Sequence, residues 1–214
     1  MIKVNKISKI YRDKSSEQEV FKTLSANFDA STSYSIVGPS GSGKTTLLNL
    51  LSGLDNFDEG SINVNGVELY SAGAEAKSKL RKALFGFAYQ FHYLLENLTV
   101  FENCLASCFG NDNGAIEKIL KELEIVHIKD KFPSNISGGE KQRASIARAL
   151  AAKPKILILD EPTGNLDQSN SLIIQDFILS YAKKNKSLVI YATHDISFAE
   201  RADKMLKISD EGLV

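Results

Sequence analysis

Apolar residues in this chain gather in short runs separated by glycines and polar turns. Continuous apolar runs at 33–37, 155–159 and 187–193 are typical of strands buried on both faces of a parallel sheet. Segments with helical spacing, at 46–51 and 172–182, follow two of these runs. The alternation of buried strands and helices predicts an α/β fold whose sheet is mostly parallel.

The first thirty residues follow a different pattern, with strand-like stretches around one polar turn. The stretches lie at 2–4, 7–11 and 21–24, and the turn spans 12–19. This pattern predicts an N-terminal antiparallel β arm. Glycine-containing turns on both sides of 61–64 predict a further hairpin. Three more elements are expected on similar grounds: a polar helix at 72–82, a strand at 86–89 and a last strand at 205–208.

The pattern is helical from about residue 98 to residue 152. The spacing predicts helices over 101–109, 114–123 and 140–152, with a break at 110–114. This helical stretch interrupts the series of buried strands, so we expect it to be a subdomain inserted into the sheet-forming core.

Composition excludes some classes of function. The chain has 214 residues and its Lys and Arg balance its Asp and Glu, which removes the simplest argument for binding nucleic acid. No apolar run is long enough to span a membrane and the N-terminus does not resemble a signal peptide, so we expect a soluble, cytoplasmic chain that reaches membranes only through a partner. Cys104 and Cys108 are expected to be ordinary buried thiols.

Residues 38–45 have the spacing G-x-x-x-x-G-K-T, between a predicted buried strand and a predicted helix. Glycines let the backbone turn its N–H groups inward, where they and the helix N-terminus hold phosphates. Lys44 is expected to reach the β- and γ-phosphates and Thr45 to bind Mg²⁺. A glycine-rich turn without a ligand is the alternative, which the strand–loop–helix context disfavours. The expected nucleotide-binding residues here are Gly38, Ser40, Gly41, Gly43, Lys44, Thr45 and Thr46.

Two acidic residues end the predicted strand at 155–159. Asp160 lies at the carboxyl edge of the sheet, where parallel sheets bind ligands, and is expected to coordinate Mg²⁺. Glu161 could act as general base for attack of water on the γ-phosphate. The alternative is a solvated or helix-capping pair of carboxylates.

A histidine and a glutamine follow two other predicted strands. His194 could hold the γ-phosphate and the attacking water, although a lone histidine is more often structural. The amide of Gln90 could coordinate Mg²⁺ and contact water.

A second helix start also has the character of an anion site. Ser137, Gly138 and Gly139 precede the predicted helix at 140–152. One nucleotide needs only one phosphate loop, so this second segment is expected to bind the nucleotide that another chain holds. A plain helix cap is the alternative.

Taken in order, these motifs resemble those of ATP-binding-cassette (ABC) ATPases over nearly the whole chain. The resemblance gives each motif a family role: Walker A at 38–45, the Q-loop glutamine at Gln90, the signature at 136–140, Walker B and the catalytic glutamate at 156–161, the D-loop at 164–167 with Asp167, the switch histidine at His194, and an adenine-stacking aromatic at Tyr11. Two signature positions depart from the family, with Ile136 for the usual Leu and Glu140 where Gln is common.

The resemblance implies one ABC ATPase domain over 1–214. In it, approximately 1–90 and 153–214 form a RecA-like core with the β arm, and approximately 91–152 form a helical subdomain that carries the signature. It also implies a homodimer that closes around two ATP molecules, with Mg²⁺, and that drives transmembrane permease subunits. No nucleic-acid partner is expected.

Within the family, three stretches look like the ATPases of bacterial lipoprotein-release and macrolide-efflux exporters. They are 90–99, 137–149 and 161–167. Such proteins drive transmembrane partners that act on their substrate from the periplasmic side, so the resemblance implies export, or extrusion of a lipoprotein, peptide or drug. It also implies that this chain lies at the cytoplasmic face of the inner membrane, as a peripheral subunit held by its partners. Phe85, Ala88 and Glu96 depart from its commoner residues, near the surface expected to touch the membrane partner.

Three other functions remain as alternatives. A nucleotide-gated signalling scaffold with little hydrolysis would share every motif. A soluble ABC ATPase that acts on nucleic acid or ribosomes usually has tandem cassettes or coiled-coil insertions, and neither pattern is present here. A small-molecule kinase with a phosphate loop would have no role for the signature segment.

Overall fold

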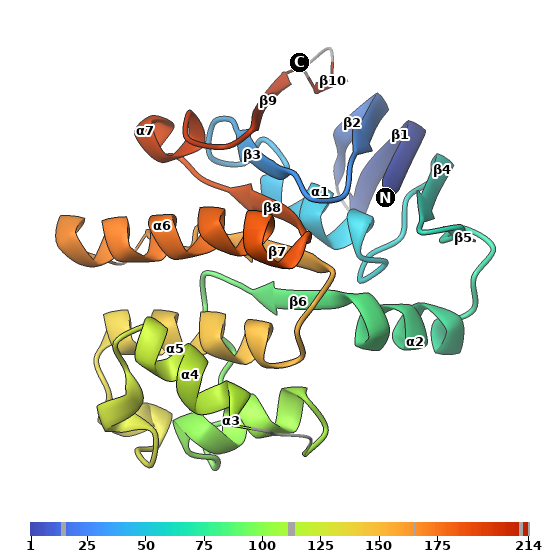
Figure 1. Cartoon of the computed structure of the whole chain (residues 1–214). Helices are drawn as coiled ribbons and strands as arrows, with labels where there is room; N and C mark the ends of the chain where they lie inside the picture. The colour runs from blue at the N-terminus through green and yellow to red at the C-terminus, as the bar shows by residue number, and fades with distance from the viewer. Residues whose placement is uncertain (14–15, 111–113, 165, 210–211, 214) are drawn as a thin grey trace.

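A computed structural model of the chain describes residues 1–13, 16–110, 114–164, 166–209 and 212–213. The strands among these residues form two sheets, which occupy the upper half of the view in Figure 1. Three helices, α3 (Val100–Ser107), α4 (Ala115–Glu122) and α5 (Gly138–Ala151), group below them in Figure 1. The α/β fold predicted from the sequence is confirmed.

The larger sheet carries the predicted buried strands. Within the described residues it has six strands in the order β10-β9-β3-β8-β7-β6, all parallel except the terminal pair of β10 with β9. Every residue of its three central strands is buried, as the continuous apolar runs predict. The strands are β3 (Ser33–Val37), β6 (Phe85–Ala88), β7 (Ile156–Asp160), β8 (Leu188–Ala192), β9 (Lys204–Ser209) and β10 (Gly212–Leu213).

Alternate residues of the central strands face two different hydrophobic cores, because side chains alternate across a strand. Ile156 and Ile158 belong to the core shared with the second sheet, whereas Leu157 and Leu159 belong to the core shared with the helices α3 to α5. The sheet therefore joins the two parts of the molecule. The helices that accompany it are α1 (Lys44–Leu51), α2 (Ala74–Leu84), α6 (Gln168–Asn185) and α7 (Ile196–Ala199).

The predicted β arm is the second sheet, in which the described strands run in the order β2-β1-β4-β5. Its strands are β1 (Ile2–Asp13), β2 (Ser16–Phe28), β4 (Glu59–Val64) and β5 (Val67–Glu68). All three pairings are antiparallel, as predicted. The hairpin from β4 to β5 turns at Asn65 and Gly66, which both have positive φ as a two-residue hairpin turn requires. Residues 14–15 of the predicted polar turn lie outside the described residues.

Several predicted elements have different ends in the structure. The polar helix expected at 72–82 is α2, two residues further along, because Gly73 is its N-cap. The helix expected at 172–182 is the longer α6, which Asp167 caps. The helix expected to begin at 140 begins at Gly138 because Ser137 caps it. Positions 111–113 of the expected break at 110–114, and Asn165 of the expected D-loop, are outside the described residues.

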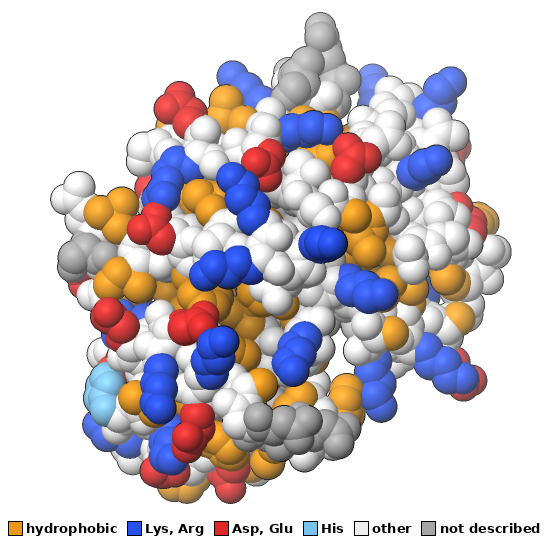
Figure 2. All heavy atoms as spheres, viewed as in Figure 1, with side chains coloured by type: hydrophobic (Ala, Val, Ile, Leu, Met, Phe, Trp, Pro, Cys, Tyr) orange, Lys and Arg blue, Asp and Glu red, His pale blue; other side chains and the backbone are white. Residues whose placement is uncertain are grey.

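The surface carries both signs of charge. On the face drawn in Figure 2, Lys and Arg side chains alternate with Asp and Glu over both halves of the molecule.

Two short 3-10 turns, η1 (Val126–Ile128) and η2 (Pro133–Asn135), connect α4 to α5.

Candidate nucleotide-binding site

The loop between β3 and α1 has the backbone shape of a phosphate cradle. Gly41 and Gly43 have φ of 80° and 94°, which residues with a side chain rarely adopt. A Cβ atom at Gly43 would also lie 2.5 Å from Val20 Cγ1 and 2.9 Å from Phe21 Cζ. Glycine is therefore required at position 43 both by conformation and by the close approach of β2.

Lys44 is the first residue of α1 and lies inside the cradle. Its Nζ donates hydrogen bonds to the carbonyl oxygens of Gly38, at 2.9 Å, and Pro39, at 3.0 Å. The first turn of α1 carries no acidic residue, so the positive end of the helix and the ammonium act together. This arrangement favours an anionic ligand.

Thr45 and Asp160 lie 115 positions apart in the sequence but form a direct contact. The Thr45 hydroxyl donates a hydrogen bond of 2.6 Å to Asp160 Oδ2. Burial raises the pKa of the Asp160 carboxyl, and the hydrogen bond from Thr45 and the charge of Lys44 oppose that rise only in part. A cation bound beside these oxygens would stabilise the ionised carboxylate.

Glu161 and His194 form a second pair at the ends of β7 and β8. Glu161 Oε2 lies 2.8 Å from His194 Nδ1 and 3.3 Å from the backbone N of His194, which donates to it. The Glu161 side chain is 12% exposed, whereas the His194 side chain is 72% exposed. Glu161 has a φ of 49°, an uncommon conformation for a side chain of this kind. The sequence predicted a site role for each residue but not this pairing.

Tyr11 lies at the other end of the site, on β1. Its hydroxyl donates a hydrogen bond of 2.7 Å to Asp55 Oδ2, and Lys9 Nζ lies 4.4 Å from the ring centroid. These contacts fix the ring, which remains 42% exposed. Desolvation is the main reason why the pKa of the Tyr11 hydroxyl is raised.

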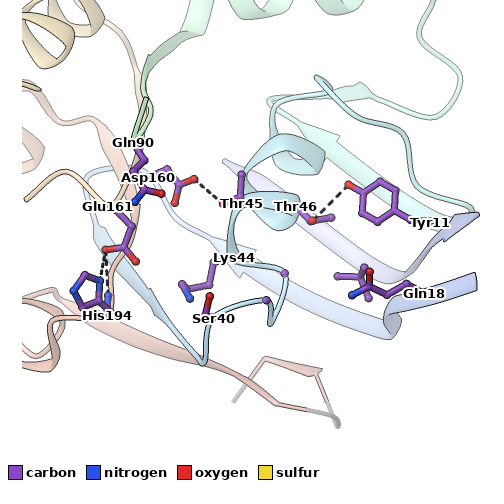
Figure 3. Close-up of a pocket in the computed structure, with 13 residues that line it drawn as sticks. Tyr11, Gln18, Ser40, Lys44, Thr45, Thr46, Gln90, Asp160, Glu161 and His194 are labelled. Atoms are coloured by element: carbon purple, nitrogen blue, oxygen red, sulfur yellow. Dashed lines mark hydrogen bonds and ion pairs between the residues drawn. The ribbon is translucent and has the colours of Figure 1, made fainter. Parts of the chain in front are cut away.

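These side chains share one cavity of about 540 Å³, which Figure 3 shows in close-up. Tyr11 and Gln18 lie at one end of it, Lys44 in the middle, and Asp160, Glu161 and His194 at the other end. The predicted site residues that line the cavity are Tyr11, Ser40, Gly41, Gly43, Lys44, Thr45, Thr46, Gln90, Asp160, Glu161 and His194.

Five predicted site residues are not part of this lining in the described structure: Gly38, Ser137, Gly138, Gly139 and Asp167. Gly38 still contributes its carbonyl oxygen to Lys44. Ser137 and Gly138 are exposed at the N-terminus of α5, and Asp167 is exposed at the N-terminus of α6. A nucleotide in this cavity would therefore not meet the signature residues of its own chain.

Sequence reasoning missed two cavity residues, Gln18 and Val20 of β2. The register of the β arm places Gln18 opposite Tyr11, so a nucleotide base beside Tyr11 would lie near β2 as well. The pairing of Tyr11 with Gln18 could have identified Gln18, but the sequence pattern did not define that register. No sequence signal pointed to Val20.

The fold and the cavity define a nucleotide-binding protein with a phosphate loop and a buried acidic strand end. A family profile described as "ABC transporter" matches residues 21–164, so the chain belongs to the ABC transporter family. It is an ABC ATPase that binds and hydrolyses ATP, as the motifs predicted.

Its relatives include the lipoprotein-releasing system ATP-binding protein LolD of several bacteria. The chain is 38% identical to LolD of Pseudomonas fluorescens, over 97% of this chain and 94% of the relative. It is 33% identical to LolD of Treponema denticola, over 97% of this chain and 95% of the relative.

Two solved structures have closely similar folds. One is a dimeric structure of MJ0796, a bacterial ABC transporter cassette, with a TM-score of 0.94 and 29% identity over 100% of this chain and 96% of that chain. The other is a dimer of the same cassette in a post-hydrolysis state bound to ADP and phosphate, with a TM-score of 0.93 and 29% identity over the same shares of both chains.

Proposed function

We propose that two copies of this chain close around two ATP molecules and drive permease subunits that release or export a lipoprotein-like cargo. One observation carries the proposal. The cavity contains the phosphate loop and the acidic strand end, while Ser137 and Gly138 of the signature are exposed at the N-terminus of α5. A second copy can bring its α5 to the phosphates in the cavity, where the N–H groups and the helix dipole would stabilise them.

Mg²⁺ fits the oxygen donors at one end of the cavity. Among the described residues no cluster of three His, Cys, Asp or Glu side chains could hold a metal. Thr45 and Asp160 are in direct contact, and Gln90 lines the same cavity. Hydroxyl, carboxylate and amide oxygens together with ATP phosphates suit Mg²⁺, which would neutralise phosphate charge during hydrolysis.

In the proposed reaction, Glu161 is the general base for the attacking water. His194 holds Glu161 through its Nδ1 and backbone N, and its exposed ring is available to the γ-phosphate and the water. Lys44 exchanges its contacts with the Gly38 and Pro39 carbonyls for the β- and γ-phosphates. Tyr11 stacks on the adenine, with its ring held by Lys9 and Asp55.

The membrane partner is proposed to dock beside Gln90. The described residues include no helix with the length and apolar character needed to cross a bilayer. Three large apolar side chains follow Gln90 on the surface: Phe91, Tyr93 and Leu95 are 76%, 62% and 50% exposed. We propose that these side chains meet permease subunits at the cytoplasmic face of the inner membrane, and that residues 91–152 act as a helical subdomain relative to the core of 1–90 and 153–214.

The names of the relatives support a proposal for the cargo. The LolD proteins are named for lipoprotein release, and their similarity to this chain extends over nearly the full length of both partners. Lipoprotein release is therefore the favoured process, with extrusion of a peptide or drug as the second candidate.

The test uses full-length Glu161→Gln, which retains the shape of the side chain but not its basicity. We expect ATP turnover to fall by about 100-fold or more, within the range of general base catalysis. We also expect the variant to sediment as a dimer with Mg-free ATP and as a monomer without nucleotide. Lys44→Ala is the control, and it should neither bind ATP nor dimerise.

Normal turnover in Glu161→Gln would exclude Glu161 as the base. A monomer at all protein concentrations, with ATP demonstrably bound, would contradict the shared site. Turnover that stays negligible in the parent even with its permease would favour the signalling scaffold instead.

A further inference from the structure

The N-terminus of α5 already has a negatively charged side chain beside it, that of Glu140. Ser137 and Glu140 form a capping box, in which Glu140 N donates to Ser137 Oγ at 3.3 Å and Ser137 N donates to Glu140 Oε2 at 2.8 Å. The Ser137 hydroxyl also donates to Glu140 Oε2, at 2.7 Å. One carboxylate oxygen of Glu140 thus accepts hydrogen bonds from both the hydroxyl and the backbone N–H of Ser137.

The other carboxylate oxygen is also engaged. His127 Nε2, from η1, lies 3.5 Å from Glu140 Oε1. The Glu140 side chain is 19% exposed, so it is held against the helix end rather than extended into solvent. The hydrogen bonds from Ser137 keep the pKa of Glu140 below its usual range, and the carboxyl is therefore ionised at neutral pH.

The N-termini of α1 and α5, the two helix ends proposed to bind phosphate, differ in charge. The first turn of α1, which faces the cavity, has no acidic residue, whereas the first turn of α5 contains Glu140. If α5 receives the γ-phosphate of the other chain, as the proposed function requires, the phosphate meets a fixed negative charge three residues from the serine that is to contact it. Like charges at this range repel, and the repulsion is strongest at low ionic strength.

We propose that Glu140 holds the Ser137 hydroxyl in the free chain and weakens closure of the ATP-bound dimer. The inference rests on the proposed shared site. Its consequence is that the ATP-bound dimer forms less readily than a dimer with an uncharged residue at position 140. Glu140 is a positioning residue, because it acts through Ser137.

The chain provides a matched control. The helix α3 begins with the same capping box, in which Glu102 N donates to Thr99 Oγ1 at 3.2 Å and Thr99 N donates to Glu102 Oε2 at 2.8 Å. Glu102 is not among the residues of the cavity or the signature. Glu140→Gln and Glu102→Gln both preserve a capping box and remove one charge from a helix N-terminus, so they should change stability by similar small amounts.

The experiment measures the ATP-dependent dimerisation of full-length Glu161→Gln by sedimentation, alone and with each second substitution. With Mg-free ATP, Glu140→Gln should lower the dimer dissociation constant by about tenfold or more, which corresponds to about 1.4 kcal/mol. Glu102→Gln should leave it unchanged. The gain from Glu140→Gln should shrink at high salt, which a purely structural effect would not do. Glu140→Ala, which removes charge and cap together, should also tighten the dimer if the amide variant fails to fold.

Equal dissociation constants for Glu161→Gln alone and for Glu161→Gln with Glu140→Gln would overturn the inference while leaving the shared site intact. A weaker dimer, or equal tightening by Glu102→Gln, would overturn it as well. If neither the parent nor Glu140→Gln forms a dimer with ATP bound, the shared site itself is wrong and the inference falls with it.

Discussion

At the scale of single residues, the two neighbouring acids of the cavity are placed differently by the fold. Asp160 is 5% exposed, and burial raises the pKa of its carboxyl. Glu161, the next residue, is turned toward His194 and the cavity. A buried carboxylate beside a hydroxyl donor, with Lys44 nearby, is suited to hold a cation that compensates for the lost solvation.

This position of Asp160 predicts a stability gain for Asp160→Asn in the nucleotide-free protein. A carboxyl whose pKa is raised by folding binds more protons in the native state than in the unfolded state, so it lowers stability as pH rises. The unfolded-state pKa is about 3.9. The variant should therefore unfold at a higher temperature than the parent at pH 7, and the difference should vanish as pH falls below about 4.

The same variant should lose Mg²⁺-dependent ATPase activity, although its amide oxygen can still accept the hydrogen bond from Thr45. Thermal unfolding of both proteins across pH, without nucleotide, is the measurement. Parallel curves for parent and variant would contradict the argument that burial destabilises this carboxylate.

At the scale of elements, α5 and β6 can pack closely because residue 86 of β6 is a glycine, which has no side chain. A Cβ atom at Gly86 of β6 would lie 2.2 Å from the carbonyl oxygen of Ala149 and 2.8 Å from Pro154 Cγ. The first of these neighbours is backbone in the last turn of α5, so it cannot move without the helix. The end of the signature helix therefore lies directly on the strand that leads to Gln90.

Gly86→Ala is expected to destabilise the chain by about 1–3 kcal/mol, the usual cost of overpacking. Gly73→Ala is the control, because a Cβ there meets no atom within 4 Å and only the cap of α2 changes. Its cost should be below about 1 kcal/mol. Urea unfolding of both variants measures the difference, and equal losses would show that β6 and α5 can separate easily.

At the scale of the whole molecule, an arginine of α5 holds the loop after Gln90. The Arg148 guanidinium donates to the carbonyl oxygens of Tyr93 and, at 3.0 Å, His92, and Ser145 Oγ donates to His92 O at 3.1 Å. His92 and Tyr93 both have positive φ, so this turn depends on support from outside. The signature helix, the cavity glutamine and the exposed apolar side chains are thus mechanically connected.

Arg148→Ala should destabilise the protein by about 1–3 kcal/mol, because it leaves a loop carbonyl without its donor. Backbone amides of the loop after Gln90 should exchange with solvent faster, which hydrogen exchange can measure. Arg148→Lys is the matched variant and should be intermediate, since an ammonium lacks the planar fork that reaches two carbonyls. Unchanged exchange in the alanine variant would show that the loop holds its conformation independently.

Much of the fold and most of the cavity lining could be read from the chain itself. Continuous apolar runs marked the central strands, and the phosphate loop was recognisable because its function needs particular residues at neighbouring positions. The ends of helices could not be read in the same way, since caps such as Gly73 and Ser137 decide them through single hydrogen bonds and backbone angles.

The sequence alone determined which nucleotide-handling motifs are present and in what order, because each motif is local and its spacing is fixed by backbone geometry. Only the tertiary structure decided what those motifs touch. The contact of Glu161 with His194, the place of Gln18 opposite Tyr11, and the separation of Ser137 from its own cavity all depend on strand register and packing between distant segments. Such contacts form only when the whole chain reaches its lowest free energy, so no single stretch of sequence predicts them.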